Sequence, residues 1–190
     1  MRMKFPKETV LLIIDVQKAI DNPVWSKHGN RNHPKAEENM ATIIQEWRKS
    51  GRNIIHVKHE SKEPNSTYRP DSFGCEFKEC VTPIAGERII SKHVNSAFIG
   101  TKLEATLREQ NISDLVVFGV ITNNSVETTV RMAGNLGFNT YVVEDATFTF
   151  AKPDYYGRIY SAEEVHGISL ANMNHEYCKI ISTSELMNML

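Results

Sequence analysis

The feature that most constrains the fold is a series of six short apolar segments, most of them separated by helical patterns. The first, residues 10–16, reads VLLIIDV and is continuously apolar up to its Asp, as expected for a strand buried on both faces of a sheet. Strands that alternate with helices favour parallel pairing through right-handed crossovers. The sequence therefore predicts a three-layer, Rossmann-like α/β fold, with a six-stranded, mainly parallel sheet and helices on both faces. The other predicted strands are residues 53–59, 87–93, 114–120, 139–145 and 178–183.

Helical spacing is clearest between the first two predicted strands, where apolar residues recur at i, i+3, i+4 and i+7 from Met40 to Trp47. Gly51 is placed to end this helix. Two segments, 21–33 and 60–83, have no regular pattern, and long loops in a compact domain are more often functional than idle. Further helices are predicted over residues 101–110, 125–136, 161–174, where the SAEE start is typical of a capping box, and 184–190.

Composition limits the class of protein. The chain has 190 residues, a formal net charge of −1 and 41% hydrophobic residues, which predicts a single globular domain over residues 1–190. The balanced charge argues against nucleic acid or a membrane surface as a partner. The apolar runs are only as long as strands, the first residues lack the apolar region of a signal peptide, and three cysteines form no disulfide framework. We expect a cytoplasmic protein that acts on a small molecule.

Polar residues stand at the ends of several predicted strands. In an open α/β sheet, ligands bind beyond the carboxyl ends of the strands. Asp15 ends the first strand, Lys92 ends the third, and Ser125 begins the helix after the fourth. Each alone has an ordinary structural explanation, respectively as a turn residue, a solvated charge and a helix N-cap. Their occurrence on one edge of the predicted sheet favours a catalytic site.

The chemistry of this trio is clear for a thiol at position 125. A helix N-terminus and a nearby ammonium stabilise a thiolate and move a cysteine pKa from about 8.5 to roughly 3.5–7.5. The Asp15 carboxyl could act as general acid and base, and backbone N–H groups before the helix could form an oxyanion hole. Such a site would hydrolyse amides, whereas the hydroxyl of Ser125 is much harder to deprotonate.

Three motifs, in order along nearly the whole chain, resemble those of the isochorismatase-like cysteine hydrolases. They are LLIIDVQ (11–17), SKHVNSAFIGTKLE (91–104) and GVITNNSVETTVRMA (119–133). The segments VEDATFTF (143–150) and SAEEVHGISLA (161–171) resemble the closing segments of the amide-hydrolysing branches. The resemblance implies that Asp15 is the proton shuttle and Lys92 the stabilising cation. It also implies a cis peptide between Val120 and Ile121, and an oxyanion hole made of the N–H groups of Ile121 and Ser125.

The function that this resemblance implies is hydrolysis of a C–N bond in a small amide, carbamoyl or ureido compound through a thioester. Ser125 stands where the family has its nucleophilic cysteine. Either the cysteine was replaced experimentally, or the serine is native and the thiol pathway is lost. The TNN pattern of the cysteine branches favours the first explanation. The alternatives are vinyl-ether hydrolysis by acid catalysis from Asp15, as in the isochorismatase branch, and a binding protein without catalysis.

The resemblance also indicates the pocket. Asn95, Phe98, Asn124 and Phe150 match positions near the substrate in the family, and the irregular segments around Trp25 and Tyr68 could close over it. A homo-oligomer, dimer or tetramer, is implied as well.

Metal and cofactor binding are not expected. Nicotinamidases of this family hold a metal with a D-x-H…H cluster, and no histidine here has that spacing. We therefore predict no metal and no cofactor, which argues against a nicotinamidase. The histidines considered are His28, His33, His56 and His59.

Overall fold

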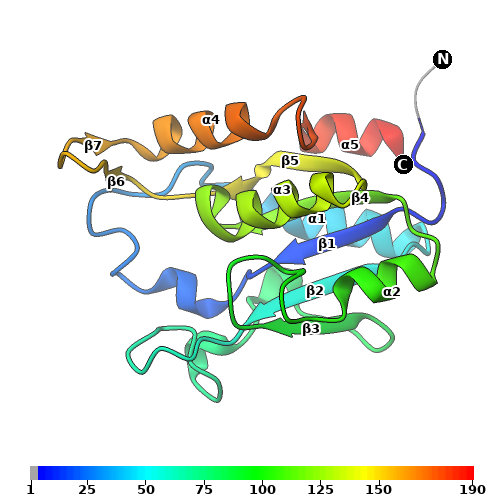
Figure 1. Ribbon diagram of the computed structural model, residues 1–190, viewed down its shortest axis with the longest axis horizontal. Helices are drawn as coiled ribbons and strands as arrows, with labels where there is room; N and C mark the ends of the chain where they lie inside the picture. Colours follow the sequence, from blue (N-terminus) through cyan, green and yellow to red (C-terminus); the bar gives the residue numbers. More distant parts are fainter. Residues whose placement is uncertain (1–3) are drawn as a thin grey trace.

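The computed structural model describes residues 4–190 and contains one six-stranded sheet (Figure 1). All neighbouring strands in it are parallel, in the order β3-β2-β1-β4-β5-β8. The α/β fold with a six-stranded parallel sheet is confirmed. The strands are β1 (Val10–Ile14), β2 (Ile54–His59), β3 (Arg88–Lys92), β4 (Asp114–Val120), β5 (Asn139–Phe148) and β8 (Lys179–Ile181).

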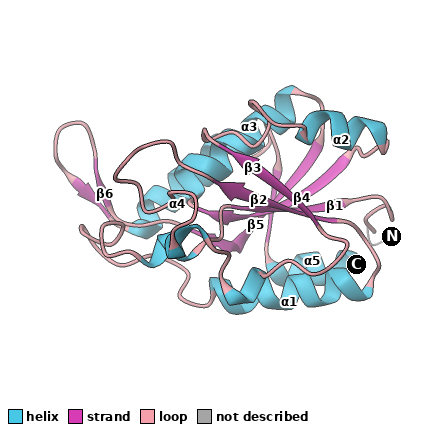
Figure 2. Ribbon diagram, turned by 90° about the horizontal axis from the view of Figure 1, so that it is seen from below, coloured by secondary structure: helices cyan, strands magenta, loops and turns pink. Residues whose placement is uncertain are grey.

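Helices cover both faces of the sheet (Figure 2). On one face, Leu11 of β1 packs in the same core cluster as Trp47 of α1. On the other, Leu12 shares a cluster with Leu103 of α2 and Val130 of α3. Successive residues of β1 thus point into opposite halves of the core, because side chains alternate along a strand. The helices are α1 (Ala36–Lys49) and α5 (Thr183–Met189) on the first face, and α2 (Leu103–Glu109), α3 (Glu127–Asn135) and α4 (Ala162–Met173) on the second.

The predicted start of α4 is confirmed, whereas the predicted start of α3 is wrong. The capping box of α4 is present: the Ser161 hydroxyl accepts from the N–H of Glu164, and the Glu164 carboxylate accepts from the N–H of Ser161. The helix predicted over 125–136 instead begins with a π-helical turn, η4 (Thr122–Val126), before α3. Ser125 therefore lies inside a turn, and its interpretation as an N-cap is wrong.

The irregular connections contain short elements that the sequence did not predict. An antiparallel hairpin of β6 (Lys152–Pro153) and β7 (Ile159–Tyr160) extends from the sheet at the left of Figure 1. Its strands have two residues each, too few for an alternating pattern to be read. Three 3₁₀ helices lie in or beside the irregular segments: η1 (Lys18–Asp21), η2 (Phe73–Cys75) and η3 (Glu79–Val81).

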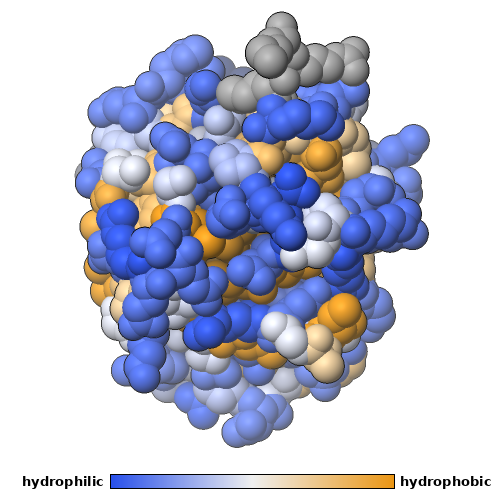
Figure 3. Space-filling view, turned by 90° about the vertical axis from the view of Figure 1, so that its right-hand side faces the viewer, coloured by the Kyte–Doolittle hydropathy of each residue, from blue (hydrophilic) through white to orange (hydrophobic). Residues whose placement is uncertain are grey.

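The two ends of the sheet differ. The strands point to the left in Figure 1, so their carboxyl ends meet there. At this edge, Gly119 of β4 lies so close to β1 that a Cβ atom would collide with the carbonyl oxygen of Ile14. The opposite end, where both termini lie, is mostly hydrophilic with apolar residues between the polar ones (Figure 3). No helix among residues 4–190 has the length and apolar character needed to cross a bilayer.

Candidate active site

The three predicted catalytic residues meet at the carboxyl edge of the sheet. The ammonium of Lys92, the last residue of β3, donates to Asp15 Oδ2 at 2.6 Å and to Ser125 Oγ at 3.3 Å. Asp15 follows β1, and Ser125 lies in η4 directly after β4. All three are buried, with exposed fractions of 1% for Lys92, 3% for Asp15 and 7% for Ser125. Three separate strands thus deliver an ammonium, a carboxyl and a hydroxyl to one point.

Local backbone features fix this geometry. Asp15 has a φ of 53°, a left-handed conformation that Asp adopts more readily than most residues. Its N–H still donates to Val57 O at 3.0 Å, so the turn begins directly at the end of the ladder with β2. The amide of Gln17 then donates to the carbonyl of His59 at 2.9 Å and accepts from its N–H at 2.8 Å. The Val120–Ile121 peptide bond, at the start of η4, is cis.

The Asp15 carboxyl is electrostatically unusual. Burial raises its pKa above the ordinary value, while the Lys92 ammonium and the Ser125 hydroxyl act in the opposite direction. Its Oδ1 atom has no hydrogen-bond partner among residues 4–190. A carboxyl with a raised pKa and a free oxygen is well suited to exchange protons with a bound molecule.

Two neighbours of the trio were not predicted as site residues. His59 Nδ1 lies 3.4 Å from Lys92 Nζ, and burial, reinforced by the Lys92 charge, lowers the pKa of His59 to about 4. Its ring contacts Tyr68 edge to face at 5.6 Å, and burial raises the pKa of Tyr68 well above its usual value. The signal for His59 was its place as the last residue of β2, the same strand-end rule that identified Lys92.

A cavity of about 120 Å³ opens at Asp15 and Ser125, and a larger one of about 620 Å³ adjoins it. Both are lined by Ile121, Asn124, Trp25 and Ser66, so they lie side by side, and the two together are called the recess below. Within it, Trp25 and Tyr68 make an edge-to-face contact at 6.1 Å, so the segments 21–33 and 60–83 meet over the site within one chain. The inner cavity is completed by Asp15, Ser125, Asn95, Ile20, His59, Tyr68 and Val120.

The predicted substrate-binding residues divide into two groups. Asn95 and Asn124 line the inner cavity, and Phe150 lines the outer one. Phe98 lines neither and lies in the core, stacked on Phe138 with ring centroids 5.9 Å apart. The prediction that Phe98 contacts the substrate therefore has no support from the cavity linings, and its ring packs in the core cluster shared with α2 and α3.

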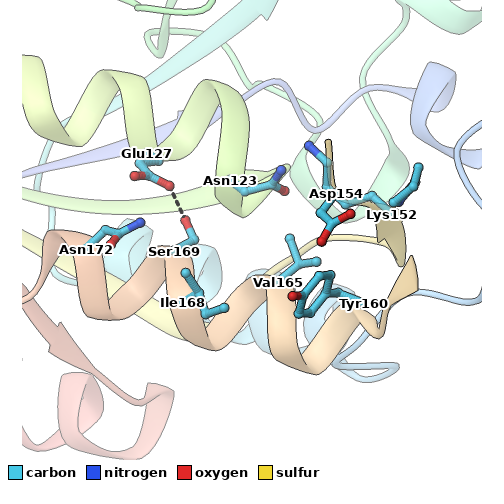
Figure 4. Close-up of a pocket in the computed structure, with 10 residues that line it drawn as sticks. Asn123, Glu127, Lys152, Asp154, Tyr160, Val165, Ile168, Ser169 and Asn172 are labelled. Atoms are coloured by element: carbon cyan, nitrogen blue, oxygen red, sulfur yellow. Dashed lines mark hydrogen bonds between the residues drawn. The ribbon is translucent and has the colours of Figure 1, made fainter. Parts of the chain in front are cut away.

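A shallower groove of about 250 Å³ lies between α4 and the β6–β7 hairpin (Figure 4). At its floor, the Ser169 hydroxyl donates to Glu127 Oε2. Asn123 lines both this groove and the outer cavity, but Asp15, Lys92 and Ser125 do not line the groove. The groove is therefore a neighbour of the candidate site and not part of it.

A second polar cluster lies outside the recess. His33 Nε2 is 3.2 Å from Glu144 Oε2, and the rings of His33 and His166 meet edge to face at 4.9 Å. His166 Nδ1 is hydrogen bonded to the hydroxyl of Thr122 at 2.8 Å. Burial lowers the pKa of His166 to about 4 and raises that of Glu144. The sequence had predicted no metal from residue spacing alone; in the structure these three residues are close enough to share an ion.

Comparison with known proteins gives a consistent set of relatives. A family model described as the isochorismatase domain matches residues 9–185. YrdC, an uncharacterized isochorismatase family protein of Bacillus subtilis (strain 168), is 43% identical over 182 residues, 96% of each chain. The crystal structure of an isochorismatase-family protein from Chromobacterium violaceum has a TM-score of 0.94 and 50% identity, covering 100% of this chain and 97% of that one.

Two further relatives have names that state an activity. Nicotinamidase 3 of Arabidopsis thaliana is 25% identical over 197 residues, covering 97% of this chain and 89% of its own. Ureidoacrylate amidohydrolase RutB of Cronobacter sakazakii is 38% identical over 73 residues, covering 38% of this chain and 32% of its own.

Proposed function

The chain belongs to the isochorismatase family of hydrolases, and from this premise we propose that it hydrolyses the C–N bond of a small amide, carbamoyl or ureido compound. The observation that carries the proposal is the bridge made by Lys92 Nζ between Asp15 Oδ2 and Ser125 Oγ at the wall of the inner cavity. The activities named for Nicotinamidase 3 and RutB support this substrate class.

In the proposed reaction, position 125 supplies the nucleophile, as a cysteine thiolate held by the ammonium of Lys92. The sulfur attacks the carbonyl carbon, and the N–H groups of Ile121 and Ser125 bind the developing oxyanion. Asp15 passes the thiol proton to the leaving nitrogen, the C–N bond breaks, and a thioester remains. Water then gives a proton to Asp15 and attacks the thioester; the C–S bond breaks, the carboxylic acid is released, and the proton held by Asp15 returns to the sulfur. Ser125 replaces that cysteine and leaves the rest of the machinery in place.

The decisive experiment restores the sulfur. Ser125→Cys should release ammonia from at least one member of a panel of small amides, carbamoyl and ureido compounds, at a rate well above that of the Ser125 protein. Ser125→Ala is the matched control and should be inactive with every member. A folded Ser125→Cys protein that is inactive on the whole panel would overturn the proposal.

A second candidate is acid-catalysed hydrolysis of a vinyl ether by Asp15, because its raised pKa and free Oδ1 suit an acid. Under this alternative, the Ser125 protein and its Ser125→Ala variant would be equally active on a vinyl ether, and Asp15→Asn would be inactive. A homo-oligomer is part of the proposal as well, and light scattering of the purified chain tests it.

A further inference from the structure

We propose that His33, Glu144 and His166 form a binding site for one divalent transition-metal ion of the zinc type, separate from the Asp15 cavity. One ligand atom from each of the three residues lies within 4.8 Å of the other two. Small side-chain movements would bring such atoms to the roughly 2.0–2.2 Å at which zinc holds nitrogen and oxygen ligands. The proposal concerns a site of its own and does not depend on the reaction at position 125.

The donor set selects the kind of ion. Two imidazoles with one carboxylate are a set that zinc uses, with a remaining position for water. Magnesium and calcium favour oxygen ligands, and this cluster offers only one carboxylate. Imidazole nitrogens bind zinc, copper, nickel and iron. A first-row divalent ion is therefore the ligand that this chemistry fits.

An independent observation comes from His166. The residue is only 5% exposed, and its Nε2 atom is buried with no hydrogen-bond partner among residues 4–190. A buried polar atom without a partner costs about 1–3 kcal/mol, so native structures rarely leave one. Since Thr122 already occupies Nδ1, Nε2 is the atom available to a metal. The contact between His33 and Glu144 does not satisfy it.

The surroundings of His166 match those of known metal ligands. A metal-bound histidine usually has its second ring nitrogen hydrogen bonded to a protein group, which fixes the ring. Here Thr122 takes that part, and Thr122 is also the first residue of η4, the turn that contains Ser125. A bound ion would therefore be connected to the η4 turn of the candidate active site through its bond to His166 and the hydrogen bond from His166 to Thr122.

The three residues come from distant parts of the chain. His33 lies in the segment before α1, Glu144 lies in β5, and His166 lies in α4; Figure 1 labels these three elements. The side chains of His33 and Glu144 are 32% and 31% exposed, so an ion can reach the cluster from solvent. An ion bound there would join the loop, the sheet and the helix, and would stabilise the folded state by binding it selectively.

The test uses the full chain after dialysis against a chelator, titrated with zinc chloride and, separately, with cobalt chloride. Calorimetry should give one zinc ion per chain and a raised melting temperature. The cobalt complex should show the visible bands of a nitrogen- and oxygen-ligated ion, without thiolate charge transfer. His33→Ala and Glu144→Gln should each lose more affinity than the about 10- to 100-fold expected for Thr122→Val, which removes only the outer partner of His166.

His175→Ala is the matched control, because His175 is exposed and lies outside the cluster; it should bind zinc as the unmodified chain does. Three results would each overturn the proposal: no stoichiometric binding by the unmodified chain, undiminished binding by the folded His33→Ala/Glu144→Gln double variant, or a thiolate band in the cobalt spectrum. The cobalt spectrum is read on the unmodified chain, so it decides the case even where a variant fails to fold.

Discussion

Two lysines among residues 4–190 are buried, and their hydrogen-bond partners differ. Lys78 is 8% exposed, and its ammonium donates to both carboxylate oxygens of Asp21, at 2.6 and 2.7 Å, and to Glu37 at 2.9 Å. Lys92 is 1% exposed and donates to one oxygen of Asp15, to Ser125 and to the carbonyl of Val94. The first is paired with two carboxylates, whereas the second is bonded to one carboxyl, a neutral hydroxyl and a backbone carbonyl.

This difference shows that burial of an ammonium does not by itself indicate catalysis. Burial lowers the pKa of Lys78, but the carboxylates of Asp21 and Glu37 raise it more, so the pKa is raised overall and the lysine stays charged. Its ammonium thereby joins the start of the 21–33 segment to α1. Around Lys92, the carboxyl of Asp15 keeps one oxygen without a partner, and that residue lines the inner cavity. The two buried lysines are therefore distinguished by the groups around them and not by their burial.

The largest expected effect on activity comes from substituting, one at a time, the two aspartates that pair with these lysines. In a Ser125→Cys background, Asp15→Asn should lower kcat by about 10²- to 10⁴-fold, because the proton shuttle is lost. Asp21→Asn should leave kcat nearly unchanged, since the Asp21 carboxylate pairs with Lys78 and does not line the inner cavity. Steady-state rates on the amide that the panel identifies measure both. Equal rates for the two variants would contradict the proposal that Asp15, and not Asp21, takes part in the reaction.

Removal of each lysine tests the same contrast through stability. Lys92→Met leaves the Asp15 carboxylate buried without a partner, so the free energy of unfolding at neutral pH should fall by about 3–5 kcal/mol. Lys78→Met should cost only about 1 kcal/mol, because Asp21 is largely exposed and Glu37 keeps Arg31 at 2.6 Å. Urea unfolding of both variants measures the difference. A larger loss for Lys78→Met than for Lys92→Met would show the opposite. The pairing of Lys78 with Asp21 and Glu37, and not that of Lys92 with Asp15, would then contribute more to the free energy of unfolding.

The fold was largely predictable because strand burial leaves a direct trace in sequence. The prediction for 114–120 coincides with β4, since that strand is buried on nearly its full length and reads as a continuous apolar run. The same logic placed Asp15 and Lys92, because parallel strands bring their carboxyl ends to one edge. The hairpin at β6 and β7 left no such trace.

The partners of these residues could not be predicted, and the reason is physical. Which group approaches Lys92 or Lys78 depends on how 21–33 and 60–83 fold, and those segments have no periodicity from which to infer direction. The contact of Tyr68 with His59 and the pairing of Lys78 with Asp21 and Glu37 were not predicted for this reason. A motif position likewise says that a residue such as Phe98 is near the pocket, but not which way its ring points; here the ring stacks on Phe138.

A smaller effect on stability is expected from His59, the neutral neighbour of Lys92. His59 has a folded pKa of about 4, below the roughly 6.5 of an unfolded chain. The unfolded state therefore binds protons first as pH falls, and stability should decrease from about pH 6.5 to about pH 4. His59→Gln should make this decrease shallower, by less than the about 1.4 kcal/mol per pH unit of one proton, because His59 is half-buried. Unfolding curves at pH 7 and pH 5 measure it, and an unchanged slope would remove His59 from the argument.

The smallest expected effect is the response of the two ion pairs to salt. Asp21 has a side chain 57% exposed, so solvent and ions reach the Lys78 pair, whereas the side chains of Lys92 and Asp15 are 0% and 5% exposed. Exposed pairs contribute about 0.2–1 kcal/mol and are screened as the Debye length shrinks to about 3 Å near 1 M salt. A double-mutant cycle of Lys78→Met with Asp21→Asn should therefore give a coupling energy below about 1 kcal/mol that diminishes with salt. The cycle of Lys92→Met with Asp15→Asn should give a larger coupling that salt leaves unchanged, because no ion enters between those groups. A salt-sensitive Lys92 pair would mean that its cavity is open to solvent ions, and the contrast between the two lysines would then be one of degree.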